Sequence, residues 1–325
     1  MMNLETSYLG LTLRNPLIIS SSGLTDRLDK VKEAEEYGAG AVVLKSIFEE
    51  QINYESGVLS DGSDYPEAAD YISYYTKTHS VDKYLELIRS AKEATSIPII
   101  PSINCVTADD WISFARNVES AGADALEVNM FFLPVDKKSS PANSENLYLT
   151  LAEKLRKALK IPFAIKLGQR FSNLLYLIDQ LYNRQVNGVV LFNRFFEPDI
   201  DINSMNIIPS SVFSTPEEKR NVLRWIAMTS AINENIDISA STGVHNGDDL
   251  IKYLLAGADT VQVCSVLYRE GHEYIKDILA SLESWMKSKQ FDSVDQFRGL
   301  LNYKNLKHSR KYERAQFMKY FSAYE

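Results

Sequence analysis

Cysteine is scarce in this sequence, and its scarcity sets the first limit on the chemistry. Only Cys105 and Cys264 occur among the 325 residues. Two cysteines exclude a framework of several disulfides, and they are too few for an iron–sulfur cluster held by four thiolates. Any redox chemistry would therefore need a bound organic cofactor or a partner.

Long apolar runs and an excess of positive charge are also missing. No apolar run reaches 18 residues, so we expect no membrane span. The N-terminus MMNLETSYLG lacks the basic and apolar segments of a secretory signal, and we expect a cytoplasmic protein. The formal net charge of -8 argues against nucleic-acid binding, because that binding depends on Lys and Arg at phosphates.

The C-terminal segment departs from this acidic balance. Residues 300–325 carry six Lys and Arg side chains against two glutamates, interleaved with tyrosine and phenylalanine. We expect 291–325 to be a basic and aromatic extension with a terminal helix whose aromatic side chains pack on the body. A docking segment for an acidic partner or an RNA is the alternative.

Short β-branched runs alternate with longer amphipathic segments, which is typical of parallel strands joined by helices. The sequence predicts eight strands, at 16–20, 41–45, 98–103, 125–129, 163–167, 188–192, 237–241 and 260–264. It predicts eight helices, at 27–37, 81–95, 108–121, 144–159, 173–184, 216–233, 247–256 and 272–288. Eight such units favour an α/β fold with one closed (β/α)8 TIM barrel over residues 1–290, rather than an open doubly wound sheet.

A small internal repeat supports the same fold. AGADALEV (121–128) and AGADTVQV (256–263) are near copies, and YGAGAVVL (37–44) follows the same scheme. In each, a glycine ends a helix and a short turn leads directly into a strand.

Functional residues of a barrel lie at the carboxyl ends of its strands. Here those ends carry two lysines with several amides and hydroxyls, and no cluster of histidines and carboxylates. We therefore expect no metal site and a site for a polar, anionic ligand.

Strands seven and eight carry the strongest sign of an anion site. A turn with Ser241, Thr242, Gly243 and Val244 follows strand seven, and Cys264-Ser265 follows strand eight. Many barrels bind phosphate here through backbone N–H groups at helix N-termini. The simpler interpretation is that Gly243 turns the chain and Ser265 caps a helix.

Two lysines interrupt or close apolar strands. Lys166 lies inside FAIKL, and Lys45 closes AVVLK. A buried lysine is costly unless an anion compensates its charge. Such lysines could stabilise a flavin that becomes anionic on reduction, a phosphate or, at one of them, a Schiff base.

Taken in order, these segments resemble the dihydroorotate dehydrogenase family of FMN-containing (β/α)8 barrels. The resemblance covers about residues 4–290 and rests on short motifs: NPLIISSSG (15–23), LKS (44–46), EVN (127–129), IKL (165–167), LFN (191–193) and the segment STGVHNGDDLIKYLLAGADTVQVCSVLYREG (241–271).

The resemblance implies a role for each matching residue. Ser21, Ser22 and Gly23 would line the flavin, with Lys45 and Ser46 near its ring and the substrate. Asn129 and Asn193 would hydrogen-bond flavin or substrate, and Lys166 would approach the N1/O2 edge of the flavin. The phosphate would lie on the turn of Ser241, Thr242, Gly243 and Val244 and on Cys264 and Ser265.

Two departures from the family pattern concern the substrate. The family places a proton-accepting Cys or Ser after strand four, where this chain has Phe132, and a phenyl ring accepts no proton. The family's Asn-rich loop after strand two has no counterpart in residues 50–80, which are rich in tyrosine and acidic residues. Ser139 or Ser140 could fold back as a substitute base.

Three functions follow as hypotheses. The first is an FMN-dependent oxidoreductase of this family, acting by hydride transfer on dihydroorotate or a related planar compound in pyrimidine biosynthesis. The second is a catalytically altered barrel that binds FMN or another phosphate ligand. The third is a lyase that uses Lys166 as a Schiff-base nucleophile. For the first we expect a small-molecule substrate, a soluble electron acceptor of unknown identity, and a homodimer.

Overall fold

The computed structural model describes residues 2–48, 81–105, 112–130, 132–195, 197–306 and 310–313. In these ranges all eight predicted strands are present, several with shorter bounds. The strands are β3 (Leu17–Ile19), β4 (Ala41–Val43), β6 (Ile99–Ile100) with β7 (Ser102–Cys105), β8 (Leu126–Met130), β9 (Phe163–Leu167), β10 (Gly188–Leu191), β13 (Asp237–Ser241) and β14 (Thr260–Val263).

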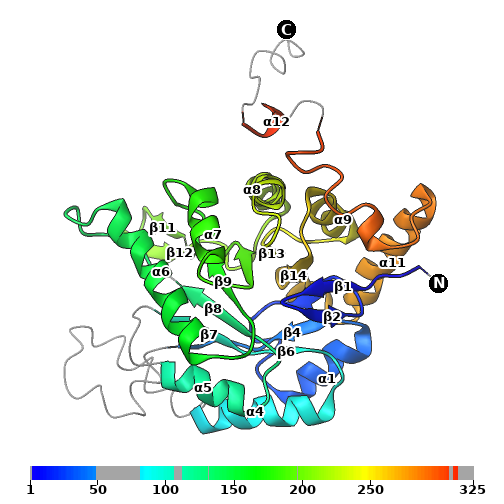
Figure 1. Ribbon diagram of the computed structural model, residues 1–325, viewed down its shortest axis with the longest axis horizontal. Helices are drawn as coiled ribbons and strands as arrows, with labels where there is room; N and C mark the ends of the chain where they lie inside the picture. The colour runs from blue at the N-terminus through cyan, green and yellow to red at the C-terminus, as the bar shows by residue number, and fades with distance from the viewer. Residues whose placement is uncertain are drawn as a thin grey trace.

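The predicted helices are confirmed where the chain is described, and they surround the sheet in Figure 1. They are α1 (Leu28–Tyr37), α4 (Val81–Ala94), α5 (Ile112–Ser120), α6 (Pro141–Ala158), α7 (Leu174–Tyr182), α8 (Lys219–Ile232), α9 (Gly247–Ala256) and α11 (Tyr274–Lys289). A further short helix, α10 (Ser265–Glu270), follows β14 and was not predicted.

The sheet closes through one interrupted strand. Its order is β5-β7-β8-β9-β10-β13-β14-β3-β4-β6, and all of these pairs are parallel. Here β5 (Ile47–Phe48) is a short additional strand beside β7. Only Pro101 separates β6 from β7, yet β6 pairs with β4 and β7 pairs with β8. Because one extended segment joins both ends of the sheet, the eight predicted strands form a TIM-barrel-like ring.

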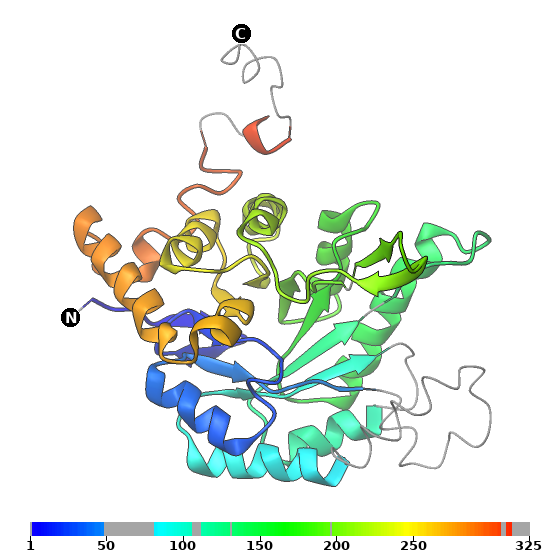
Figure 2. The ribbon, with the colours of Figure 1, turned by 180° about the vertical axis from the view of Figure 1, so that it is seen from behind.

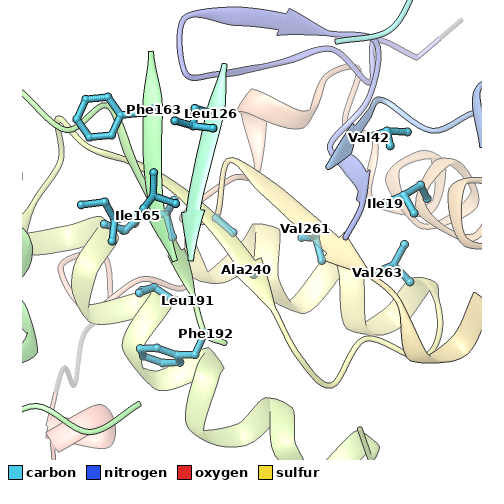
Figure 3. Close-up of a cluster of buried hydrophobic side chains, with 14 of the residues drawn as sticks. Ile19, Val42, Leu126, Phe163, Ile165, Leu191, Phe192, Ala240, Val261 and Val263 are labelled. Carbon is cyan, nitrogen blue, oxygen red and sulfur yellow. The ribbon is translucent and has the colours of Figure 1, made fainter. Parts of the chain in front are cut away.

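Side chains along the strands alternate between two apolar clusters. Outward residues such as Leu126, Ile165 and Leu191 belong to the large cluster under the helices (Figure 3). Inward residues such as Ala125, Ala164 and Val190 form a smaller cluster within the barrel. This alternation turns Glu127, Asn129 and Lys166 to the interior, which strand sequences alone left open.

The internal repeat has the predicted local geometry. Gly122 and Gly257 end their helices at φ values of 94° and 109°, a region that favours glycine. The aspartate two residues later accepts a backbone N–H of a neighbouring strand at 2.7 Å in both copies, Asp124 from Ile99 and Asp259 from Ile238. Sequence similarity here therefore reflects equivalent contacts.

The helix starts differ in how they are capped. The side chain of Glu218 accepts the Thr215 N–H at 2.8 Å, which is one half of a capping box before α8. Arg27 is the N-cap of α1, and the neighbouring Asp26 pairs with Lys30 at 2.9 Å.

Two hairpins were not predicted because each is short. The first, β1 (Thr6–Tyr8) and β2 (Leu11–Leu13), packs Tyr8 and Leu9 into the interior cluster, and the Leu9 N–H donates to Asp237 at the start of β13. It therefore plugs the barrel at the amino ends of the strands. The second, β11 (Pro198–Asp201) and β12 (Asn206–Pro209), lies at the periphery beside α6 in Figures 1 and 2.

The described part of the C-terminal extension is mainly turns, with η2 (Val294–Gln296) and α12 (Arg310–Glu313). The N–H groups of Leu301 and Tyr303 donate to Leu255 and Ala227, and the Tyr312 hydroxyl donates to Leu301. This segment packs on α8 and α9 by backbone bonds. The terminal helix that was expected in this extension is represented among the described residues by α12, and residues 314–325 lie outside them. The division into 1–290 and 291–325 stays a prediction.

Candidate functional site

Lys166 is held inside the barrel by three acceptors. Its side chain is 7% exposed. The ammonium donates to Gln262 Oε1 at 3.0 Å, to Glu127 Oε1 at 3.3 Å and to Ser20 Oγ at 3.3 Å. Because an ammonium has three N–H donors, these contacts match its capacity. Within the chain, the anion that compensates Lys166 is Glu127; the ligand anion that the sequence suggested beside Lys166 stays a prediction.

Glu127 and Gln262 complete this buried network. Glu127 is 2% exposed, as is Gln262. Gln262 Nε2 donates to Glu127 Oε2 at 2.6 Å, while Gln262 Oε1 also accepts from Ser20 at 3.0 Å. Gln262 was not among the predicted site residues, although the repeat aligned it with Glu127 and so contained the signal.

Asn104, Asn129 and Lys166 lie side by side, nearer the mouth of the barrel than Glu127. The register pairs Asn104 with Asn129 and Asn129 with Lys166 across β7, β8 and β9. Asn129 Oδ1 is buried and has no hydrogen-bond partner among the described residues. A buried amide oxygen without a partner is costly, so Asn129 is suited to accept from a ligand. Asn193 also lies at the mouth, where its N–H donates to Leu167 at 2.7 Å.

The residues that follow β3 and β4 form a hydroxyl cluster. Ser21 Oγ accepts the Ser46 N–H at 2.9 Å and lies 3.0 Å from Ser46 Oγ, which lies 2.8 Å from Ser102 Oγ. Lys45 is half-buried beside this cluster, and its N–H donates to Thr25 at 3.3 Å. The predicted pair Ser21 and Ser46 is thus brought together, and Ser102 joins it.

The turn after β13 has an unusual backbone. Thr242 has φ 88° and Gly243 has φ 78°. A β-branched residue rarely adopts this conformation, and such strain concentrates at ligand sites. Two bonds hold Thr242: its hydroxyl donates to Phe192 at 3.2 Å, and Tyr253 donates to its carbonyl at 2.6 Å.

Gly243 brings this turn against the start of α8. A Cβ at Gly243 would lie 2.6 Å from the backbone nitrogen of Lys219. Val244 is buried behind the turn, and Ser241 is buried at the end of β13. The turn therefore faces the N-terminus of a long helix, whose backbone N–H groups favour an anion.

The end of β14 meets the segment that follows β12. Ser265 Oγ accepts from the backbone N–H of Ser214 at 3.0 Å and from its hydroxyl at 3.1 Å. Ser214 Oγ also lies 3.2 Å from His245 Nε2. Burial and the nearby charges of Arg269 and Lys219 lower the pKa of His245, and only Asp249 among the charged neighbours opposes them. Arg269 and Lys219 therefore bring positive charge to the region where the phosphate was predicted, and Asp249 pairs with Lys219 at 2.5 Å.

Cys264 and Ser22 meet Tyr268 at the same end of the barrel. Burial raises the pKa of the Cys264 thiol, and a hydrogen bond with Ser22 opposes the shift. Tyr268 hydrogen-bonds Ser22, and a Cβ on Gly23 would lie 2.7 Å from its hydroxyl. Gly23 thus permits a close approach of Tyr268, a residue that sequence reasoning did not identify.

The substrate side of the site is described in part. Phe132 is half-buried directly after β8, and Phe131 and residues 49–80 lie outside the described residues. Ser140 caps α6 by accepting the Asn143 N–H at 3.2 Å. Its hydroxyl therefore has a structural role, which does not favour the substitute base.

No three His, Cys, Asp or Glu side chains of the described residues gather closely enough to hold a metal ion. None of the described helices has the length and apolar character needed to cross a membrane.

The chain is similar to known dehydrogenases over most of its length. The family model described as dihydroorotate dehydrogenase matches residues 3–286. The catalytic subunit of dihydroorotate dehydrogenase B (NAD(+)) from Thermoplasma volcanium is 27% identical over 305 residues, covering 92% of this chain and 99% of that protein. The NAD-dependent dihydropyrimidine dehydrogenase subunit PreA from Escherichia coli is 24% identical over 326 residues, covering 92% and 77%. The chloroplastic dihydropyrimidine dehydrogenase (NADP(+)) from Arabidopsis thaliana is 24% identical over 326 residues, covering 91% and 76%.

Proposed function

Since the chain belongs to the dihydroorotate dehydrogenase family and is an oxidoreductase, we propose that it binds FMN and exchanges a hydride with a dihydropyrimidine ring. The observation that carries the proposal is that Asn129 and Lys166 lie side by side inside the mouth of the barrel. The buried Asn129 Oδ1 has no hydrogen-bond partner among the described residues. Bound FMN would supply the hydride acceptor, N5.

The residues present fit FMN. The strained turn at Thr242 and Gly243, the start of α8 and the positive charges around His245 favour a phosphate group. Lys166 favours negative charge at the N1/O2 edge, and Asn129 accepts from a ring N–H. Ser21, Ser22, Gly23, Lys45 and Ser46 line the opposite side, and Asn193, Ser241, Val244, Cys264 and Ser265 complete the proposed site.

The substrate proposal is dihydroorotate or a related dihydropyrimidine. The relatives carry names of both kinds, dihydroorotate dehydrogenase and dihydropyrimidine dehydrogenase. Oxidation of such a ring requires loss of a proton as well as a hydride, and a positioned base contributes about 10²–10⁴-fold. Because Phe132 supplies no base, we propose slow turnover of dihydroorotate unless another group accepts the proton. Pyrimidine biosynthesis in the cytoplasm with a soluble electron acceptor is part of this proposal.

Anaerobic reduction tests the proposal directly. Purified protein should show the absorption bands of flavin, and these should bleach on addition of dihydroorotate or dihydrouracil. A colourless protein that takes up no FMN would contradict the cofactor proposal. A flavin-loaded protein that neither compound bleaches would favour the alternative, a catalytically altered barrel that binds FMN or another phosphate ligand.

A Schiff-base lyase fits the geometry less well. An amine must be neutral to attack a carbonyl, whereas the Lys166 ammonium is paired with Glu127 and donates to three acceptors. Trapping of a carbonyl compound on Lys166 by borohydride would reverse this conclusion.

The expected homodimer gains support from the hairpin β11–β12. Ile200 pairs with Ile207 and Pro198 with Pro209, so these four side chains share one face of the ribbon. That face is wholly apolar, and Ile200 and Ile207 are 66% and 75% exposed. An exposed apolar face of this kind marks an interface. We propose that a second copy of the chain covers this face. Each copy carries a net charge of -8 and two copies repel each other, but contact through two uncharged faces keeps that repulsion small.

Sedimentation analysis tests this interface. Replacing Ile200 and Ile207 by lysine should turn a dimer into a monomer, whereas the same change at Asp199, on the opposite face of the ribbon, should leave the dimer intact. A monomeric wild-type protein would contradict the proposal, and so would a dimer that survives both substitutions.

A further inference from the structure

The ion pair inside the barrel has a consequence for any ligand at the mouth. Glu127 Oε1 accepts from Lys166, and Glu127 Oε2 accepts from Gln262 Nε2. Gln262 Oε1 in turn accepts from Lys166. The three side chains form a closed ring in which each is bonded to the other two.

The ring fixes the orientation of the Gln262 amide. Lys166 has only donors and the Glu127 carboxylate has only acceptors. Gln262 must therefore turn its oxygen to Lys166 and its nitrogen to Glu127. The Ser20 hydroxyl donates to the same Gln262 oxygen at 3.0 Å, and this bond supports the same orientation of the amide.

The charge of Glu127 acts over a distance inside the barrel. Tyr8 is fully buried in the apolar cluster inside the barrel. Burial is the largest cause that raises the pKa of its hydroxyl, and the charge of Glu127 is the next. Tyr84 shows the same two causes, burial first, and its pKa is also raised. A carboxylate that affects these two hydroxyls also offsets the charge of Lys166, its direct partner.

We propose that Glu127 is a positioning residue that acts through Lys166 and limits the positive charge that the mouth of the barrel presents to an anionic ligand. Lys166 alone would offer one full charge to the ligand. Glu127 lies 3.3 Å from the Lys166 ammonium and pairs in register with Ala164, two residues before Lys166 and therefore further from the mouth. The pair is neutral as a whole and presents a dipole. The site then stabilises negative charge on the ligand by less than a free lysine would.

This inference rests on the proposed flavin site and refines it. If FMN is the ligand, Lys166 and Glu127 would be near the edge of the ring that becomes negative on reduction. Glu127 would then keep the reduction potential of the flavin lower than Lys166 alone would set it. Gln262 bonds both Lys166 and Glu127 and so helps to position the pair.

Sulfite is the probe for the experiment. Sulfite adds to N5 of oxidised flavin and leaves negative charge on the N1/O2 side of the ring, so its dissociation constant reports the positive charge there. We expect Glu127→Gln to lower the sulfite dissociation constant about tenfold or more and to raise the flavin midpoint potential, because the counter-charge of Lys166 is lost. Glu127→Asp keeps the charge and should stay close to the wild type.

A matched control removes the same charge elsewhere. Glu153 on α6 pairs with Arg184 at 2.9 Å and is 51% exposed. Glu153→Gln should leave the sulfite constant within about twofold, because solvent screens a surface charge. If Glu127 acts through Lys166, the effect of Glu127→Gln should disappear in a Lys166→Met background.

The outcomes separate the two proposals. Wild-type protein that takes up no FMN contradicts the proposed function, whatever the role of Glu127. Flavin-loaded Glu127→Gln with wild-type sulfite affinity and potential contradicts the present inference alone. If Glu127→Gln fails to fold, Gln262→Glu adds a negative charge to the same ring and should weaken sulfite binding; unchanged or tighter binding would overturn the inference.

Discussion

Gln262 Nε2 donates to Glu127 Oε2 at 2.6 Å, although the two residues are 135 positions apart in the chain. They occupy equivalent places in the repeat AGADALEV and AGADTVQV, each at an inward position of its strand. The repeat thus supplies an acid on β8 and an amide on β14, and Lys166 on β9 joins them. This network gives the barrel a polar centre, on which the first prediction depends.

Lys166→Met should destabilise the fold strongly. The substitution leaves Glu127 as a buried charge without its partner, which costs about 3–5 kcal/mol. Unfolding by urea should show this loss in the free energy of unfolding. The double variant Lys166→Met with Glu127→Gln should recover most of it, and a double variant as unstable as the single one would contradict this account of the pair.

Gly243→Ala should cost stability and also ligand affinity. Its φ of 78° strains any other residue, and the added Cβ would lie 2.6 Å from the Lys219 nitrogen. We expect a loss of about 2–3 kcal/mol in the free energy of unfolding and weaker FMN binding by titration.

Gly10→Ala is the control for that experiment. Gly10 has a similar φ of 72°, but nothing lies within 4 Å of a Cβ there. Gly10→Ala should cost about 1–2 kcal/mol, the backbone strain alone, and should leave FMN binding unchanged. Equal losses at the two positions would mean that the contact with Lys219 contributes nothing.

Stability should fall as the pH is lowered through the range in which His245 titrates. The pKa of His245 is lowered in the folded state from its ordinary 6.5, chiefly by burial. Between the two values the unfolded chain binds more protons, so the folded state loses stability as the pH falls through 6.5 towards the lower pKa of the folded state. His245→Gln should flatten this part of the profile of melting temperature against pH. Parallel profiles for the two proteins would show that His245 does not contribute.

Phe132→Cys should increase the rate at which dihydroorotate reduces the bound flavin. The substitution places a proton acceptor where the family has one, and a positioned base contributes about 10²–10⁴-fold. The rate is measured by stopped-flow absorbance under anaerobic conditions. Phe132→Leu is the control, since it changes the size of the side chain without adding a base, and an equal gain in both variants would contradict a role for proton transfer.

Local features of the sequence were enough for the fold and pointed to several residues of the candidate site. Alternating β-branched and amphipathic segments predicted the eight strands, and the glycines of the repeat predicted the helix ends at Gly122 and Gly257. Lys166 was identified because a charge interrupts an apolar strand, and Ser21 with Ser46 because both follow strand ends. Each of these signals is contained in a short segment of the sequence, because strand periodicity and turn-forming residues depend only on near neighbours in the chain.

Contacts between distant segments were decided by the tertiary structure alone. Closure of the sheet at Pro101 sets which strands are neighbours, and the register then brings Glu127, Lys166 and Gln262 into one ring. The tertiary structure also brings Ser214 to Ser265 and leaves the apolar face of β11–β12 exposed. A sequence determines which side chains are polar and which strands are buried. Which polar side chains meet depends on strand order and register, and those follow from packing of the whole barrel.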